Sequence, residues 1–255
     1  MREVDGLHER LIVDISQLSP AASAYVRRHG FLTEEVARDW QVGCLPMDAG
    51  GGSGGTVRGK FVTAIHNRYG NRVAYPGRDL KWEEKHEAWI RGGRTGKEPA
   101  KWSVPKGFHR GVEVYGQDRI YADPEGCRER LKGTGLVVNE GPLDVINFWE
   151  ALGIPSVGLL SNHATDVQIE RIAELANEVA DGVVTLAYDC NEAGEQGMDS
   201  DTVKFSKHCR VQRALSADMY GGALADKEGS DITPQDWEMI RSHLQREASE
   251  ETAGE

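Results

Sequence analysis

Residues 136–145, Leu-Val-Val-Asn-Glu-Gly-Pro-Leu-Asp-Val, decide the fold of this chain of 255 residues. The stretch begins as an apolar run that ends in Glu140 and Gly141, and Asp144 follows about one helical turn later. We expect a strand over 136–139 and then a helix over 142–152, which Gly153 ends. The chain therefore delivers acidic side chains where a buried strand gives way to a helix.

The same order of strand, acidic residues and helix recurs further along the chain. Residues 183–188, Val-Val-Thr-Leu-Ala-Tyr, form a second apolar run, and Asp189 and Asn191 follow it. Thr165 with Gln168 is typical of a capping box before a helix over 167–179. Further strands are expected over 156–160 and 211–219, and further helices over 193–208 and 234–247. Repeated strand–helix alternation predicts an α/β fold with a mostly parallel sheet flanked by helices.

The expected sheet brings three carboxylates to one edge. Glu140 and Asp189 directly follow strands, and Asp144 lies one turn into the helix after the first of them. Ligands of such sheets bind beyond the carboxyl ends of the strands. Mg²⁺ prefers oxygen ligands, and clustered carboxylates repel one another unless a cation lies between them. Any single one of these residues is more simply a helix cap, but the three together predict a divalent-metal site and phosphoryl-transfer chemistry.

The residues before 133 predict a different organisation. Residues 1–50 are expected to form a helical module in which Ser19 and Thr33 precede helices. The glycine-rich stretch 48–55 is typical of a flexible loop and marks a boundary. Residues 51–132 predict a basic α+β subdomain, with strands over 61–65 and 72–75 and a polar insertion loop over 83–98. The metal-binding core then spans 133–220, a strand, loop and helix over 221–247 complete it, and 248–255 predict a disordered acidic tail.

Charge is distributed unevenly between these parts. The net charge of the chain is −11, yet residues 58–110 carry thirteen Lys or Arg and only five acidic residues. Residues 111–255 carry twelve basic and twenty-eight acidic residues. Aromatic residues, among them Trp82, Trp89 and Trp102, are interleaved with the cations of the basic segment. Cations for phosphates and flat rings for bases are typical of a groove for single-stranded nucleic acid, although a solvated surface over core aromatics has the same composition.

Composition argues against several other classes of protein. No apolar run reaches about 18 residues, so neither a transmembrane helix nor a membrane partner is expected. The first residues lack the apolar core of a signal peptide. The four cysteines, at positions 44, 127, 190 and 209, share no Cys-x-x-Cys spacing, which argues against a zinc site and against a disulfide framework. A protein of the reducing cytoplasm is the simplest interpretation.

The acidic and basic stretches carry a family likeness. Glu140-Gly-Pro-Leu-Asp144 and Asp189-Cys-Asn-Glu-Ala-Gly194 resemble the E-G-x-x-D and D-x-D-x-A-G motifs of the Toprim domain. Three upstream motifs are similar to the basic subdomain of bacterial-type DNA primases: Val57-Arg58-Gly-Lys60-Phe, Arg72-Val-Ala-Tyr-Pro-Gly-Arg78 and Pro99-Ala-Lys101-Trp102-Ser. In this order the motifs resemble a primase catalytic core over residues 20–240.

The resemblance implies a function and assigns residues to it. A primase core is a nucleotidyltransferase that makes short RNA primers on a single-stranded DNA template from nucleoside triphosphates. The implied cofactor is Mg²⁺ or Mn²⁺, with no zinc expected. The implied catalytic acids are Glu140, Asp144 and Asp189, and the implied metal ligands are Glu140, Asp189, Asn191 and Asp231. The implied contacts to template or nucleotide are Arg58, Lys60, Arg78, Lys101 and Trp102.

The sequence departs from the family pattern in ways that bear on partners. Asn191 stands where the family has a second aspartate, which removes one negative charge from the site. No Cys/His cluster precedes residue 20, and no long segment follows the core, so neither the zinc-binding module nor the helicase-binding domain of the family is expected. These departures imply a partner in trans, either a replicative helicase or a zinc-ribbon protein. They also keep two alternatives open, a Toprim metal-dependent nuclease and a catalytically degenerate accessory protein that binds nucleic acid.

Overall fold

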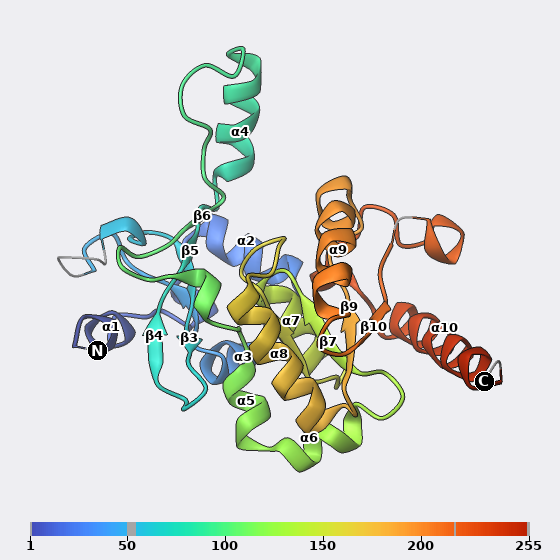
Figure 1. Ribbon diagram of the computed structural model, residues 1–255. Coiled ribbons are helices and arrows are strands. Elements are labelled where there is room, and N and C mark those ends of the chain that lie inside the picture. The colour runs from blue at the N-terminus through green and yellow to red at the C-terminus, as the bar shows by residue number, and fades with distance from the viewer. Residues whose placement is uncertain (1, 50–54, 217, 254–255) are drawn as a thin grey trace. The chain divides into compact units, whose positions relative to one another are not determined.

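The chain folds into two compact units (Figure 1). The computed structural model describes residues 2–49, 55–216 and 218–253. The first unit comprises Met1–Ile65 and Asn71–Phe108, and the second comprises His66–Gly70 and His109–Glu255. Most of the glycine-rich stretch 48–55, which we expected to be a loop, lies outside the described residues.

The second unit is built on a four-stranded parallel sheet. Its strands are β7 (Leu136–Asn139), β8 (Ser156–Gly158), β9 (Val183–Leu186) and β10 (Arg210–Arg213), in the spatial order β10-β9-β7-β8. Neighbouring strands pair in parallel. The helices that follow β7, β8 and β9 are α7 (Pro142–Glu150), α8 (Asp166–Val179) and α9 (Glu192–Phe205). The predicted α/β class with a parallel sheet is confirmed.

Apolar side chains cover both faces of this sheet. Leu136 belongs to one buried cluster, together with Ile172 of α8. Val137 belongs to the other, together with Phe148 of α7 and several residues of α10 (Pro234–Ala253). Successive residues of a strand point to opposite faces, so a sheet with apolar residues on both faces needs helices on both.

Helix α10 extends further than the sequence predicted. Trp237 meets Phe148 edge-on at 5.2 Å between ring centroids, and Ile240 and Leu244 are buried beside them. We expected the helix to end near 247 and an irregular acidic tail over 248–255. Residues 248–253 are instead helical, and 254–255 lie outside the described residues. Among the described residues no helix, α10 included, is both long and apolar enough to cross a membrane.

Residues 109–132 pack with the second unit and not with the basic segment to which we assigned them. They form α5 (Gln117–Ala122) and α6 (Pro124–Arg130), and they place Ile120 and Cys127 in the same buried cluster as Leu136. The boundary expected at 132 therefore lies closer to 108 in the structure.

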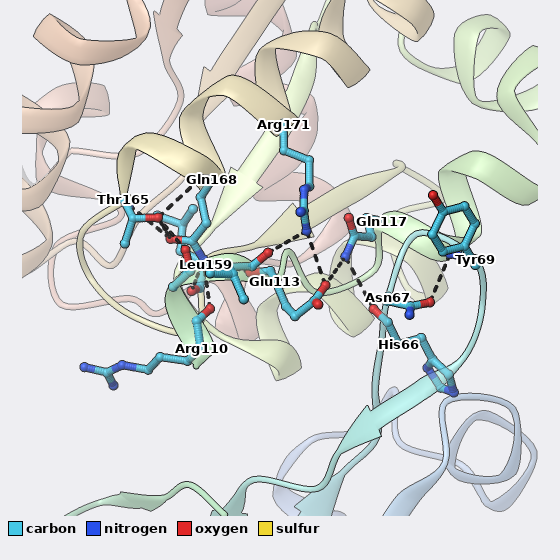
Figure 2. Close-up of polar contacts among 12 residues, drawn as sticks. His66, Asn67, Tyr69, Arg110, Glu113, Gln117, Leu159, Thr165, Gln168 and Arg171 are labelled. Carbon is cyan, nitrogen blue, oxygen red and sulfur yellow. Dashed lines mark hydrogen bonds and ion pairs between the residues drawn. The ribbon is translucent and has the colours of Figure 1, made fainter. Parts of the chain in front are cut away.

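A polar network fastens the start of this segment to α8 (Figure 2). Gln168 Nε2 donates to the backbone oxygens of Glu113 and Leu159, each at 2.8 Å. Arg171 Nη1 lies 3.3 Å from Glu113 Oε2, and Gln117 Nε2 donates to the same oxygen at 2.9 Å. These bonds join residues up to 58 positions apart, and composition along the chain does not reveal such contacts.

The first unit combines short helices with an antiparallel sheet. Its first three helices are α1 (Arg2–His8), α2 (Pro20–Arg28) and α3 (Glu34–Asp39), and Ser19 and Thr33 accept backbone N–H groups as N-caps of the last two. The sheet contains β1 (Val42–Cys44), β2 (Phe61–Thr63), β5 (Gly77–Arg78) and β6 (Trp102–Ser103), in the order β1-β2-β5-β6. Between β2 and β5 the chain forms a two-stranded sheet of β3 (Ile65–His66) and β4 (Arg72–Ala74).

The predicted insertion loop over 83–98 was wrong, because most of it is helix α4 (Trp82–Arg91). Its charged side chains suggested a loop, but Trp82, His86 and Trp89 recur at helical spacing and stack on one another. Glu83 and Glu84 lie in the first turn, where negative charge stabilises a helix. The glycine-rich part that follows α4 remains irregular.

Candidate active site

Glu140 and Asp189 meet at the carboxyl edge of the parallel sheet. They follow the neighbouring strands β7 and β9, in which Val138 pairs with Leu186. Glu140 Oε1 accepts a hydrogen bond from the backbone N–H of Asp189 at 3.1 Å. The two acidic motifs, 49 residues apart in the sequence, are thus in direct contact.

Gly194 makes this contact possible. A Cβ atom at Gly194 would lie 2.1 Å from the backbone oxygen of Asp189 and 2.9 Å from Glu140 Oε1. The first distance is far below any van der Waals contact between a carbon and an oxygen atom. The glycine is therefore needed for the close approach of α9 to the end of β9.

Asp144 is buried among hydrogen-bond donors and other carboxylates. It occupies the first turn of α7, is 6% exposed, and accepts the backbone N–H of Gly141 through Oδ2 at 2.8 Å. Its other oxygen, Oδ1, accepts the backbone N–H of Ser230, also at 2.8 Å. Burial, followed by the negative charges of Asp189, Glu228 and Glu140, raises the pKa of Asp144 well above its usual range.

A short turn from the C-terminal part of the chain completes the acidic edge. We call residues 228–232 the acidic turn; its centre is the 3-10 helix η5 (Gly229–Asp231). Asn147 of α7 holds this turn, because its Nδ2 donates to Gly229 O at 3.0 Å and to Ile232 O at 2.9 Å. A Cβ atom on Gly229 would lie 2.7 Å from Asp144 Cβ, so the turn can lie this close only with glycine at that position.

The acidic turn contains one predicted residue and one that we missed. Asp231 is exposed and its Oδ2 accepts the backbone N–H of Glu228 at 3.4 Å, within the turn that contacts Asp144. Glu228 was absent from our predicted site, although its charge acts on Asp144. Glu228 lies three residues before Asp231, so the acidic turn brings two acidic residues, and not one, to the site.

Asn191 acts as a helix cap in the structure. Its Oδ1 accepts the backbone N–H groups of Ala193 at 3.0 Å and Gly194 at 3.1 Å, at the start of α9. The side chain is exposed. Its predicted role as a metal ligand is untested and stays a prediction.

The donors at this edge have the chemistry that a hard divalent cation requires. Within the described ranges, no three acidic, histidine or cysteine side chains already form a metal-binding group. Mg²⁺, however, keeps several water ligands and commonly takes only one or two carboxylates plus substrate phosphate. Burial and, after it, repulsion by neighbouring carboxylates raise the pKa of Asp144, and a cation at this edge would relieve the repulsion. The buried Asn139, whose amide oxygen and nitrogen both lack a hydrogen-bond partner, lies beside Gly229 at the same edge. These residues fit such a cation.

Three of the five predicted nucleic-acid contacts lie together in the first unit: Arg78 on β5, Trp102 on β6 and Lys60 directly before β2. Arg78 on β5 pairs in register with Trp102 on β6, and its guanidinium lies 5.9 Å from the centre of that indole ring. Lys60 donates to Ser103 Oγ, and burial lowers the pKa of Lys60. The strands thus present cations beside an aromatic ring, as expected for a surface that binds nucleotides.

The remaining two predicted contacts, Lys101 and Arg58, make different interactions. Lys101 precedes β6, and its ammonium group lies 5.6 Å from the ring centre of Trp82. Arg58 donates through Nε to the backbone oxygen of Ala49 at 2.8 Å, so part of its guanidinium supports the start of the glycine-rich stretch.

Solved structures of known proteins share the fold of this chain. No family model and no curated protein sequence matches this chain. The Aquifex aeolicus primase, solved with its zinc-binding and RNA polymerase domains, is similar with a TM-score of 0.66 and 15% identity; the match covers 94% of this chain and 60% of that one. The Escherichia coli primase catalytic core gives a TM-score of 0.64 at 18% identity, over 95% of this chain and 79% of that one. A DnaG primase catalytic domain bound to single-stranded DNA gives 0.65 at 16% identity, over 95% and 77%. The chain thus spans less than two thirds of the Aquifex structure, and it has the fold of a DnaG-type primase catalytic core.

Proposed function

We propose that this protein is a primase-type nucleotidyltransferase that joins ribonucleoside triphosphates into short RNA primers on single-stranded DNA. One observation carries the proposal. Glu140, Asp144 and Asp189 lie beside the acidic turn at the carboxyl edge of the parallel sheet, and the fold is primase-like. In this proposal the acidic residues form a Toprim-type site, which the motif likeness of residues 140–144 and 189–194 supports.

The reaction needs a proton acceptor and fixed phosphates. The 3′-oxygen of the growing primer forms a bond to the α-phosphorus of the incoming nucleotide, and the bond from that phosphorus to the pyrophosphate oxygen breaks. Glu140 is the proposed acceptor of the hydroxyl proton, because the Asp189 N–H orients one of its oxygens. Lys60 and Arg78 are the proposed partners of the triphosphate and template phosphates. Such positioning and charge neutralisation supply most of the catalysis in phosphoryl transfer.

Mg²⁺ or Mn²⁺ is the proposed cofactor. Glu140 and Asp189 would hold it, with Asp231 and Glu228 of the acidic turn as further candidates. When bound, such a cation supplies positive charge against the triphosphate and the leaving pyrophosphate. Asp144, whose two oxygens already accept backbone N–H groups, is better suited to hold the acidic turn in place.

The direct test offers the protein single-stranded DNA and labelled ribonucleoside triphosphates with Mg²⁺ or Mn²⁺. We expect short products that alkali destroys and that require both template and cation. The same reaction is run with a zinc-ribbon protein from the same source, because start-site selection can require one in trans. DNA cleavage in the absence of nucleotides, without any such product, would favour the nuclease alternative and contradict the proposal.

One observation favours a second candidate, a nucleic-acid-binding protein that has lost catalysis. Asn191 brings no charge, and its side-chain oxygen is engaged as the α9 cap. Calorimetric titration with Mn²⁺ separates the two candidates. The catalytic proposal expects a binding signal that Asp189→Ala removes, and the second candidate expects none.

A further inference from the structure

Helix α4 and the residues after it form an arm on the first unit. The arm leaves the sheet after β5 and returns at β6, and these two strands pair Arg78 directly with Trp102. We call residues 82–101 the arm and residues 91–97 its tip. Figure 1 shows α4 projecting beyond the sheet that contains β5 and β6, and no residue of α4 is buried.

Contacts within the arm hold it together. Trp82 stacks on His86 at 4.6 Å between ring centroids, and His86 stacks on Trp89 at 5.7 Å. The returning chain is tied to this stack, because Trp82 Nε1 donates to Pro99 O at 2.9 Å and His86 Nε2 lies 3.3 Å from Glu98 Oε1. The aromatic rings of the arm are thus engaged in supporting it, and their contacts explain why a mainly polar segment keeps a defined shape.

The tip is basic and exposed. Its sequence, Arg91-Gly-Gly-Arg-Thr-Gly-Lys97, contains three cations and no acidic residue, and all seven residues are exposed. Arg94 lies 5.9 Å from the ring centre of Trp89, and Arg91 makes an exposed ion pair with Glu87 at 3.4 Å, which contributes little. Gly93 and Gly96 have φ angles of +74° and +79°, which glycine adopts most readily, so they shape the turn that presents the cations.

We infer that the tip of the arm binds the sugar–phosphate backbone of the nucleic acid on which this protein acts. The inference rests on the proposed function. Lys60, Arg78 and Trp102 form a basic and aromatic surface at the base of the arm, and the tip adds a second group of cations to it. Arg91, Arg94 and Lys97 are exposed, and the ion pair of Arg91 with Glu87 is exposed and weak, so these cations can bind phosphates. The tryptophans of the arm already contact His86, Arg94 and Lys101, so the contact is to the backbone and not by base stacking.

The test compares salt dependence of binding between variants of the whole chain. Fluorescence anisotropy of a labelled single-stranded oligonucleotide gives the dissociation constant at several salt concentrations. In the variant R91A/R94A/K97A we expect weaker binding, on the order of tenfold at 0.1 M salt, and a plot of log affinity against log salt that is shallower by about 2. The variant R91K/R94K keeps the charge and should bind like the unaltered protein.

A second triple variant controls for net charge. K132A/K207A/R241A removes three exposed cations from the second unit and should leave affinity and salt slope unchanged. Thermal unfolding and tryptophan emission confirm that the arm variants fold. If the unaltered protein binds no DNA, the proposed function itself fails. If it binds and R91A/R94A/K97A has the same affinity and slope, or weaker affinity at an unchanged slope, the arm does not contact phosphates and the inference is overturned.

Discussion

The backbone N–H of Ser230 donates a hydrogen bond to Asp144 Oδ1 at 2.8 Å, which joins residues 86 positions apart. Asp144 also accepts the N–H of Gly141, so a single carboxylate ties the start of α7 to the acidic turn. The candidate site is therefore assembled from three parts of the chain: the end of β7, the end of β9 and a turn from the C-terminal part.

Replacing Asn147 with alanine should loosen the acidic turn. The variant removes the Asn147 donor from the buried oxygens of Gly229 and Ile232, although Gly229 O keeps the Ile232 N–H at 3.4 Å, and this should lower the free energy of unfolding by about 2–4 kcal/mol. Denaturant unfolding measures this loss, and hydrogen exchange should become faster over 228–232 before other parts of the second unit. Asn177→Ala, at an exposed position on α8, is the matched control and should change stability little. Equal exchange over 228–232 in both variants would contradict the role of Asn147.

Replacing Gly194 with alanine should disturb the site directly. The added methyl group would overlap the Asp189 carbonyl and crowd Glu140, at an expected cost of about 1–3 kcal/mol in stability. Primer synthesis should fall more than the fraction of folded protein does. Gly6→Ala, in α1 and with no atom within 4 Å of the new carbon, should be neutral or slightly stabilising. An active and fully stable Gly194→Ala variant would show that the close approach is not required.

Asp201 should be a major source of stability in the second unit. It is fully buried in α9 and accepts Tyr188 Oη at 2.9 Å, the Ala164 N–H at 2.7 Å and Lys204 Nζ at 3.0 Å. Asp201→Ala removes the acceptor of the buried Tyr188 hydroxyl and of the Ala164 N–H, while Lys204 Nζ keeps the Ala164 oxygen, and should cost about 3 kcal/mol or more. Asp199→Ala, on the same helix, removes only an exposed ion pair with Arg213 and should cost under about 1 kcal/mol. Similar midpoints of denaturation for the two variants would refute this assignment.

Glu228→Gln should change the response to metal. Removing this charge relieves repulsion on Asp144, so the metal-free variant should melt at the same or a slightly higher temperature. Added Mn²⁺ should then stabilise it less than it stabilises the unaltered protein, because one oxygen ligand has lost its charge. Thermal unfolding with and without Mn²⁺ measures both effects, and the exposed Glu170→Gln on α8 is the control. A metal-induced shift identical in all three proteins would place Glu228 outside the metal site.

The parts of this molecule that depend on local signals were predictable from the sequence. The strand over 136–139 and the capping box of Thr165 and Gln168 were confirmed, because each rests on neighbouring residues. Helix α4 was missed although Trp82, His86 and Trp89 repeat at helical spacing, because we gave more weight to the charged residues of this segment than to that spacing.

The features that the sequence did not predict depend on contacts between distant residues. Asn147 looks like an ordinary helix residue until the acidic turn, some 80 positions later, lies against it. Glu228 differs from other surface acids only through its proximity to Asp144. The bonds of Gln168 and Arg171 to Glu113 hold residues after 108 in the second unit, and the change from a basic to an acidic segment near 110 is the sequence signal that lay closest to this boundary.

Glu140 and Asp189 are the residues to which we assign chemistry on nucleotides. Primer synthesis by Glu140→Gln and Asp189→Ala, measured beside their binding to single-stranded DNA, tests this assignment most directly. We expect both variants to bind DNA with the affinity of the unaltered protein and to make no detectable primer, because each has lost a carboxylate at the sheet edge. Primer synthesis at the unaltered rate in either variant would contradict the account.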